Sequence, residues 1–174
     1  AFQPTARVRS VLANLEGVWT KCKPLLAATP NKADAVEFYD VNEALQDAAH
    51  NATLAYESVT GAPLDHLVGM TGRQRMLSQR MAKFYQAIAW GVGNDKSPGE
   101  LEKARKEFSA AHQELAAAPS NTQQIKESLD LVKQQWLFFE NALNQKAGPD
   151  KRPQIAVATT SERILEEMET VVGL

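Results

Sequence analysis

The sequence predicts an all-α protein, an antiparallel up-down helical bundle, from three observations. Ala, Leu, Gln, Glu and Lys are abundant, whereas aromatic residues make up 7% of the 174 residues and only 9 Gly and 8 Pro occur, a usage typical of helices. Apolar residues recur with the 3.6-residue period of a helix between a few breaks at Pro and Gly. These breaks are short, which favours antiparallel neighbours.

The first two helices are predicted on either side of a Pro-containing break. The first runs from Thr5 to Ala28 and is closed by Thr29-Pro30-Asn31. Pro24 lies inside this range and favours an early end to the regular turns. The second runs from Lys32 to Tyr56, ahead of Gly61-Ala62-Pro63, where a break and a kink are both open alternatives because Pro is tolerated in a new first turn.

Four more helices follow. The third is predicted from Leu64 to Trp90, where a Gly-rich segment closes it. The fourth runs from Ser97, as N-cap ahead of a Pro in the first turn, to Ala118. The fifth runs from Asn121-Thr122 to about Gln145, and the sixth starts after Pro153 and continues to the end of the chain.

The first two helices resemble the last two in the order of their residues. The two segments compared are residues 15–45 and 131–165. In each, an apolar stretch that ends in Trp is followed by a Leu, a Pro and then an Ala-Val pair. We therefore interpret residues 1–60 as a helical hairpin that ends a preceding copy, and residues 61–174 as a four-helix module, packed together as one compact unit. Two amphipathic hairpins that are alike by pattern alone are the alternative.

Composition excludes several classes of function. The 19 basic and 21 acidic residues give no general positive field for nucleic acid, and no apolar run approaches the roughly 18 residues that span a bilayer. Cys22 is the one cysteine, and His50, His66 and His112 fall on different helices, so neither a disulfide framework nor a metal site is expected. Ser78 has no local base. We expect no cofactor and no enzyme activity.

The ends of the chain suggest processing. It begins at Ala1 without an initiator Met and stops at Gly173-Leu174 without a clear helix stop. We expect a processed or trimmed piece of a longer protein, in which a leader or membrane anchor would lie outside this chain.

Residues 70–85 stand out from the generic bundle, because four cations and two amides lie among three methionines inside one predicted helix. At 100° per residue one apolar stripe, which also contains Gln74, should face the core: Leu67, Met70, Leu77, Met81, Phe84, Tyr85 and Ile88. The small residues Gly72 and Ala82 on a second face would let another helix approach closely. This face consists of Val68, Gly72, Arg75, Gln79, Ala82 and Gln86.

Arg75 lies in the middle of this second face, which carries no acidic residue. If the face packs against another helix, the guanidinium leaves bulk water unpaired, which costs several kcal/mol. A small oxyanion would remove that cost, with the Gln79 amide or a backbone N–H near Gly72 completing its shell. The alternative is that Arg75 reaches solvent or pairs with a Glu or Asp of another helix. Arg73 and Arg80 are expected at the surface or in salt bridges.

The segment from Gly72 to Lys83, GRQRMLSQRMAK, resembles the signature of PilJ-type sensory domains, the N-terminal region of type IV pilus methyl-accepting chemotaxis transducers. It is similar, more distantly, to the ligand-binding helix of the NarX and NarQ nitrate/nitrite sensor kinases. The resemblance covers residues 60–174. When the motif is matched to this segment residue by residue, its Gly corresponds to Gly72 and its anion-binding Arg corresponds to Arg75. Met76, Ser78 and Arg80 match the motif as well. The kinases carry apolar or hydroxyl residues where this chain has Arg73 and Gln74.

The resemblance implies a periplasmic four-helix bundle that binds nitrate or nitrite between two copies of the signature helix, with one Arg from each. This chain carries one copy, so the second Arg would come from a homodimer partner or from a signature helix missing at the N-terminus. We name Arg75, Gly72, Gln79 and Arg73 as candidate ligand-binding residues. A membrane would be reached only through segments absent from this chain. The alternative function is a structural or partner-binding module that uses the same face for dimerisation, without a small ligand.

Overall fold

The computed structural model describes residues 5–60, 63–148 and 150–173, and these residues form six α-helices and no strand. The all-α prediction is therefore confirmed. Contacts between residues divide the chain into two compact units, residues 1–66 and residues 67–174. The predicted boundary lies at residues 60–61, and the prediction that the two parts pack as one unit stays a prediction.

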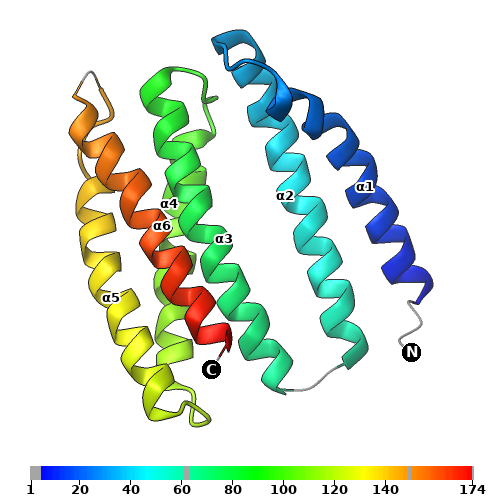
Figure 1. Cartoon of the computed structure of the whole chain (residues 1–174), viewed down its shortest axis with the longest axis vertical. Helices are drawn as coiled ribbons and strands as arrows, with labels where there is room; N and C mark the ends of the chain where they lie inside the picture. The colour runs from blue at the N-terminus through cyan, green and yellow to red at the C-terminus, as the bar shows by residue number, and fades with distance from the viewer. Residues whose placement is uncertain (1–4, 61–62, 149, 174) are drawn as a thin grey trace. The chain divides into compact units, whose positions relative to one another are not determined.

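The first unit contains α1 (Ala6–Ala27) and α2 (Lys32–Thr60), which run antiparallel as a helical hairpin (Figure 1). The Thr5 hydroxyl caps α1 by accepting a hydrogen bond from the Val8 N–H at 3.2 Å. The expectation that Pro24 ends the regular turns early is wrong, because α1 continues past it to Ala27. Pro24 lacks an N–H, but its carbonyl still accepts from the Ala28 N–H at 3.1 Å.

The second helix extends beyond the predicted end at Tyr56 and reaches Thr60. Neither Tyr56 nor the residues that follow it break a helix, and the first Gly of the interruption is Gly61. Whether the chain breaks or kinks at Gly61-Ala62 is a question that falls outside the described residues.

The second unit is an up-down-up-down bundle (Figure 1). Its helices are α3 (Pro63–Trp90), which begins just before the unit boundary, α4 (Ser97–Ala117), α5 (Gln123–Leu143) and α6 (Lys151–Gly173). All four predicted helices are present, with differences at their ends.

Two predicted helix starts are wrong in detail. Ser97 is the first helical residue of α4 rather than its N-cap, and its hydroxyl accepts from the Asn94 N–H at 3.0 Å in the loop before the helix. The sixth helix starts at Lys151, before Pro153 rather than after it. Pro153 lies in the first turn, where its missing N–H has no intrahelical partner to lose.

One apolar cluster fills the centre of the second unit. The indole of Trp136 stacks on Phe108 with ring centroids 4.4 Å apart, which joins α5 to α4. From α3, the predicted core stripe contributes Leu77, Met81 and Tyr85, so its orientation is confirmed there. The other buried members of the cluster are Ala82, Ala104, Leu115, Leu129, Val132, Phe139, Ala142, Leu143, Val157, Ile164, Met168 and Val171.

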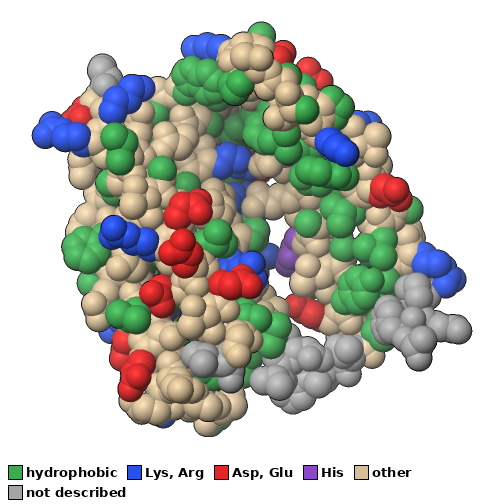
Figure 2. Space-filling model, viewed as in Figure 1, with side chains coloured by type: hydrophobic (Ala, Val, Ile, Leu, Met, Phe, Trp, Pro, Cys, Tyr) green, Lys and Arg blue, Asp and Glu red, His purple; other side chains and the backbone are tan. Residues whose placement is uncertain are grey.

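The outer face of α6 is acidic. Figure 2 shows acidic side chains gathered over this helix, and the exposed ones are Glu162, Glu166 and Glu169. Within the described part of the chain, no helix combines the length and the apolar character that crossing a membrane requires.

Candidate functional site

The second face of α3 packs against α6. Two contacts join the helices along this face. The Arg75 guanidinium forms an ion pair with Glu169 of α6, and the Gln86 amide donates a hydrogen bond to the Gln154 carbonyl of α6 at 2.7 Å. Ala82, between these contacts, is buried. α6 therefore lies beside Arg75 and Ala82, whereas Val68 of the same face is exposed.

Arg75 is half-buried and already holds one carboxylate. Its Nη2 lies 2.5 Å from Oε2 of Glu169, and the exposed fractions of the two side chains are 35% and 62%. This is the alternative that the sequence left open, pairing with an acid of another helix. The pair leaves Nε of Arg75 buried and without a hydrogen-bond partner among the described residues.

Gln79 adds a second donor of the same kind. Its side-chain Nε2 is buried, and no described residue accepts a hydrogen bond from it. Gln79 follows Arg75 by four residues, so both side chains leave the same face of α3 one turn apart. Guanidinium Nε and amide Nε2 are hydrogen-bond donors only, and each buried donor without an acceptor costs about 1–3 kcal/mol. The face therefore has two donor nitrogens that a hydrogen-bond acceptor would stabilise.

Gly72 lies one turn before Arg75 on the same face. A Cβ built on Gly72 would meet no described atom within 4 Å. The expectation that a small residue here permits close approach of another helix stays a prediction. Gly72 leaves space beside Arg75 among the described residues.

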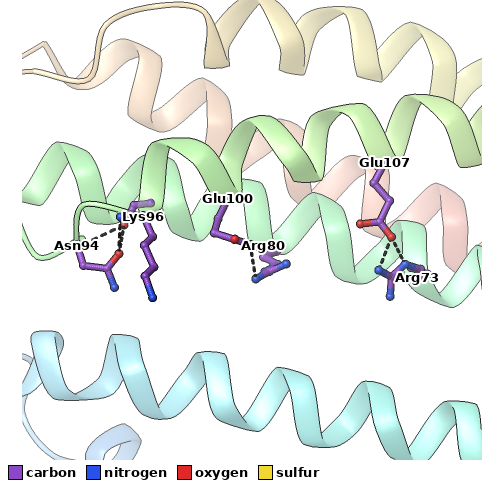
Figure 3. A network of polar contacts seen from close by, with 7 residues as sticks. Arg73, Arg80, Asn94, Lys96, Glu100 and Glu107 are labelled. Atoms are coloured by element: carbon purple, nitrogen blue, oxygen red, sulfur yellow. Dashed lines mark hydrogen bonds and ion pairs between the residues drawn. The ribbon is translucent and has the colours of Figure 1, made fainter.

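Arg73 and Arg80 point to another helix. Figure 3 shows Arg73 paired with Glu107 and Arg80 paired with Glu100, both on α4, and the second pair measures 3.1 Å. The prediction of salt bridges for these two arginines is confirmed. Because α4 and α6 contact different sides of α3, the structure does not bring Arg73 together with Arg75 and Gln79, and its predicted contact with a ligand stays a prediction.

Gln74 fixes α3 to α4 inside the core. Its side chain is fully buried, and its Nε2 donates to the Phe108 carbonyl at 2.9 Å. Its Oε1 has no donor among the described residues. The position of Gln74 within the apolar stripe agrees with the prediction, and the hydrogen bond explains how an amide is tolerated there.

Sequence reasoning missed Glu169. It lies on the last helix, far from the signature, among several glutamates of similar pattern. The sequence indicates only that a half-buried Arg needs a counter-ion. It does not indicate which Asp or Glu of another helix supplies that counter-ion.

The histidines do not form a site. Among the described residues no group of three or more His, Cys, Asp or Glu side chains is arranged to hold a metal ion. His112 stacks on Phe108 with ring centroids 6.4 Å apart, and its Nδ1 is buried without a partner in the described structure. Burial lowers the pKa of His112 below its ordinary value, Lys133 lowers it further, and Asp130 opposes both.

Comparison with known families agrees with the helical pattern and the signature. Residues 65–172 match the family model PilJ, described as the N-terminal domain of type IV pili methyl-accepting chemotaxis transducers. No curated protein and no solved structure gave a significant match. The matched region contains the signature helix, Arg75 and Glu169, and covers more than half of the chain. The chain therefore belongs to the PilJ family, a family of non-enzymatic sensory domains of chemotaxis transducers.

Proposed function

We propose that this domain recognises a small inorganic oxyanion, nitrate or nitrite first, through Arg75 and Gln79 of α3. The observation that carries the proposal is the pair of buried donors on one face, Arg75 Nε and Gln79 Nε2, which lack acceptors among the described residues. Membership of a sensory family makes ligand recognition, rather than catalysis, the activity to explain.

The chemistry of the two donors suits a planar anion. A guanidinium presents N–H groups in one plane, which match the oxygens of nitrate or nitrite, and charge-assisted hydrogen bonds of this kind are stronger than neutral ones. An amide one turn away contributes a further donor. A small ion would approach along the exposed part of the Arg75 side chain, beside the open position at Gly72, and would reach the buried donors as the side chains around them move.

A second Arg is part of the proposal. By resemblance to the nitrate sensor kinases, one Arg comes from each of two signature helices. The chain has one signature helix, so the second would come from a partner copy or from another signature helix of a longer protein. The open space at Gly72 is compatible with such a helix approaching there.

We propose that the domain acts in the periplasm. The N-terminal region of a chemotaxis transducer samples solutes outside the cytoplasm, and the signalling output lies in other parts of such a protein. The match to the N-terminal domain of these transducers supports this assignment.

The test is thermal unfolding with nitrate, nitrite, chloride and sulfate titrated at constant ionic strength. We expect saturable stabilisation by nitrate or nitrite beyond that by chloride, by about 2.7 kcal/mol when the ligand is at one hundred times its Kd. Arg75→Ala should abolish this stabilisation while leaving the helical circular dichroism intact, because it removes the charged donor.

The matched control is Arg80→Ala, which removes the same charge from the same helix on the side that faces α4. This variant should keep the response to nitrate. A nitrate response of Arg75→Ala equal to that of the wild-type protein would contradict the assignment of the site.

The alternative function is a structural or partner-binding module without a small ligand. The ion pair between Arg75 and Glu169 favours it, because the guanidinium already has a counter-ion inside the chain. The same titration separates the two functions, since a structural module would show only gradual, non-saturating changes in the order sulfate, chloride, nitrate, which reflect the general effect of each anion on burial.

A further inference from the structure

Glu169 is paired with the guanidinium of Arg75, to which the proposed ligand would bind. Its carboxylate holds Nη2 of Arg75, whereas the ligand would bind the same guanidinium through Nε and the neighbouring Gln79 amide. An anion at this site would lie next to a carboxylate of the same charge. Repulsion between the two and competition for one cation therefore work against simultaneous binding.

The ion pair is weak enough to be displaced. Glu169 is exposed over 62% of its side chain, so water replaces Arg75 as its partner at little cost. Exposed ion pairs of this kind contribute only about 0–1 kcal/mol to stability. Arg75 is less exposed than Glu169, and its buried Nε has no acceptor in this arrangement among the described residues.

We propose that Glu169 is an internal competitor that sets the affinity and the readout of the Arg75 site. In the absence of ligand its carboxylate neutralises Arg75, and an oxyanion binds by displacing it. The inference rests on the proposed function, because it presupposes that an oxyanion binds at Arg75.

Displacement links the site to the end of the last helix. Glu169 lies in the last turns of α6, between the buried residues Met168 and Val171 on one side and the exposed outer face on the other. Its pairing with Arg75 is a direct contact between α3 and the C-terminal part of α6. Binding of the anion exchanges this contact between helices for a contact with ligand, so ligand occupancy changes how α6 is held to α3.

The test compares nitrate affinity in three forms of the full chain by isothermal titration calorimetry, with sodium chloride replaced by sodium nitrate at constant ionic strength. Glu169→Gln keeps the size of the side chain and removes the competing charge, and it should bind nitrate about two- to fivefold more tightly than the wild-type protein. Unfolding of the two proteins without nitrate checks that the fold is unchanged.

Glu162→Gln is the matched control. Glu162 lies seven residues earlier, two turns away along the same exposed face of α6, so its removal changes the field of the helix by the same charge. Affinity should change less than twofold in this variant. An equal gain in both variants would mean that the acidic face as a whole, and not Glu169 as a competitor, sets the affinity, which would overturn the inference.

Three further outcomes separate the inference from the function on which it rests. If the wild-type protein binds nitrate and Glu169→Gln binds it equally or more weakly, the oxyanion site stands and the proposal that Glu169 competes for it is wrong. If only Glu169→Gln binds nitrate, Glu169 competes strongly enough to block binding in the wild-type protein. Absence of binding in all forms would reject the oxyanion site, and the competitor with it.

Hydrogen exchange gives the readout of α6. Nitrate should change the exchange rates of amides in the last turns of α6 in the wild-type protein, because the contact with Arg75 is released. In Glu169→Gln, where the charged pair is already absent, nitrate should change them less. Equal changes in both proteins would contradict the link between displacement and α6.

Discussion

Three arginines of one signature differ in their partners because of their places around α3. Arg73 and Arg80 are seven residues apart, two helical turns, and both reach α4. Arg75 is two residues from Arg73, which turns it by about 200° to the side that contacts α6. Of the three, Arg75 is the one whose counter-ion is mostly exposed, because the side chain of Glu169 is 62% exposed whereas those of Glu107 and Glu100 are 30% and 32% exposed.

His112 predicts a pH dependence of stability. Its pKa is lowered from the ordinary value near 6.5, mainly by burial, so the folded protein keeps the ring neutral where the unfolded chain takes up a proton. Because the unfolded state then binds more protons, the free energy of unfolding should fall as pH decreases below about 6.5 and level off below the folded pKa. Protonation would also place a charged N–H at the buried Nδ1.

Urea denaturation at pH 7.5 and pH 5 measures this effect. His112→Asn removes the titrating ring and should lose part of the decrease between the two pH values. The carboxylates titrate mostly below this window. A decrease of the same size in the variant would mean that other groups carry the pH dependence.

At the scale of the element, α3 holds a glycine where a side chain would fit. Gly72 lies inside the helix, and no described atom is within 4 Å of an added Cβ. Gly in a helix interior is about 0.8–1 kcal/mol less favourable than Ala. Gly72→Ala should therefore raise the free energy of unfolding by about 0.5–1 kcal/mol, measured by chemical denaturation.

Gly93 offers the contrast in the loop after α3. An added Cβ there would lie 2.8 Å from the Ser97 hydroxyl oxygen, which accepts from the Asn94 N–H. Gly93→Ala should be destabilising, because the side chain that organises the loop would have to move. Destabilisation by Gly72→Ala as well would show that something covers Gly72 in solution, such as a second signature helix.

At the scale of the whole molecule, the second unit has the core that independent folding requires. Its apolar cluster draws on all four helices of residues 67–174. A fragment of residues 63–174, which keeps α3 whole, should give strong helical circular dichroism and a single cooperative thermal transition. A broad transition without cooperativity would mean that the cluster alone does not stabilise the unit.

The sequence predicts the helices well because Pro and Gly separate long stretches with one consistent period. The predictions that are wrong concern local backbone chemistry, such as Pro24 and Pro153, both of which are accommodated inside helices. The face that carries Arg75 follows from periodicity within α3. The identity of its counter-ion does not, because pairing with Glu169 depends on the axial register of two helices, which no periodicity within one helix determines.

The contacts of α3 with its two neighbours differ in stiffness. Toward α4, a buried amide hydrogen bond from Gln74 and the flanking ion pairs of Arg73 and Arg80 resist both rotation and sliding over consecutive turns. Toward α6, the polar contacts are the partly exposed ion pair of Arg75 at the signature and one hydrogen bond from Gln86 near the other end of α3. Mechanical strain applied to the bundle should therefore separate α3 from α6 at the signature before it separates α3 from α4.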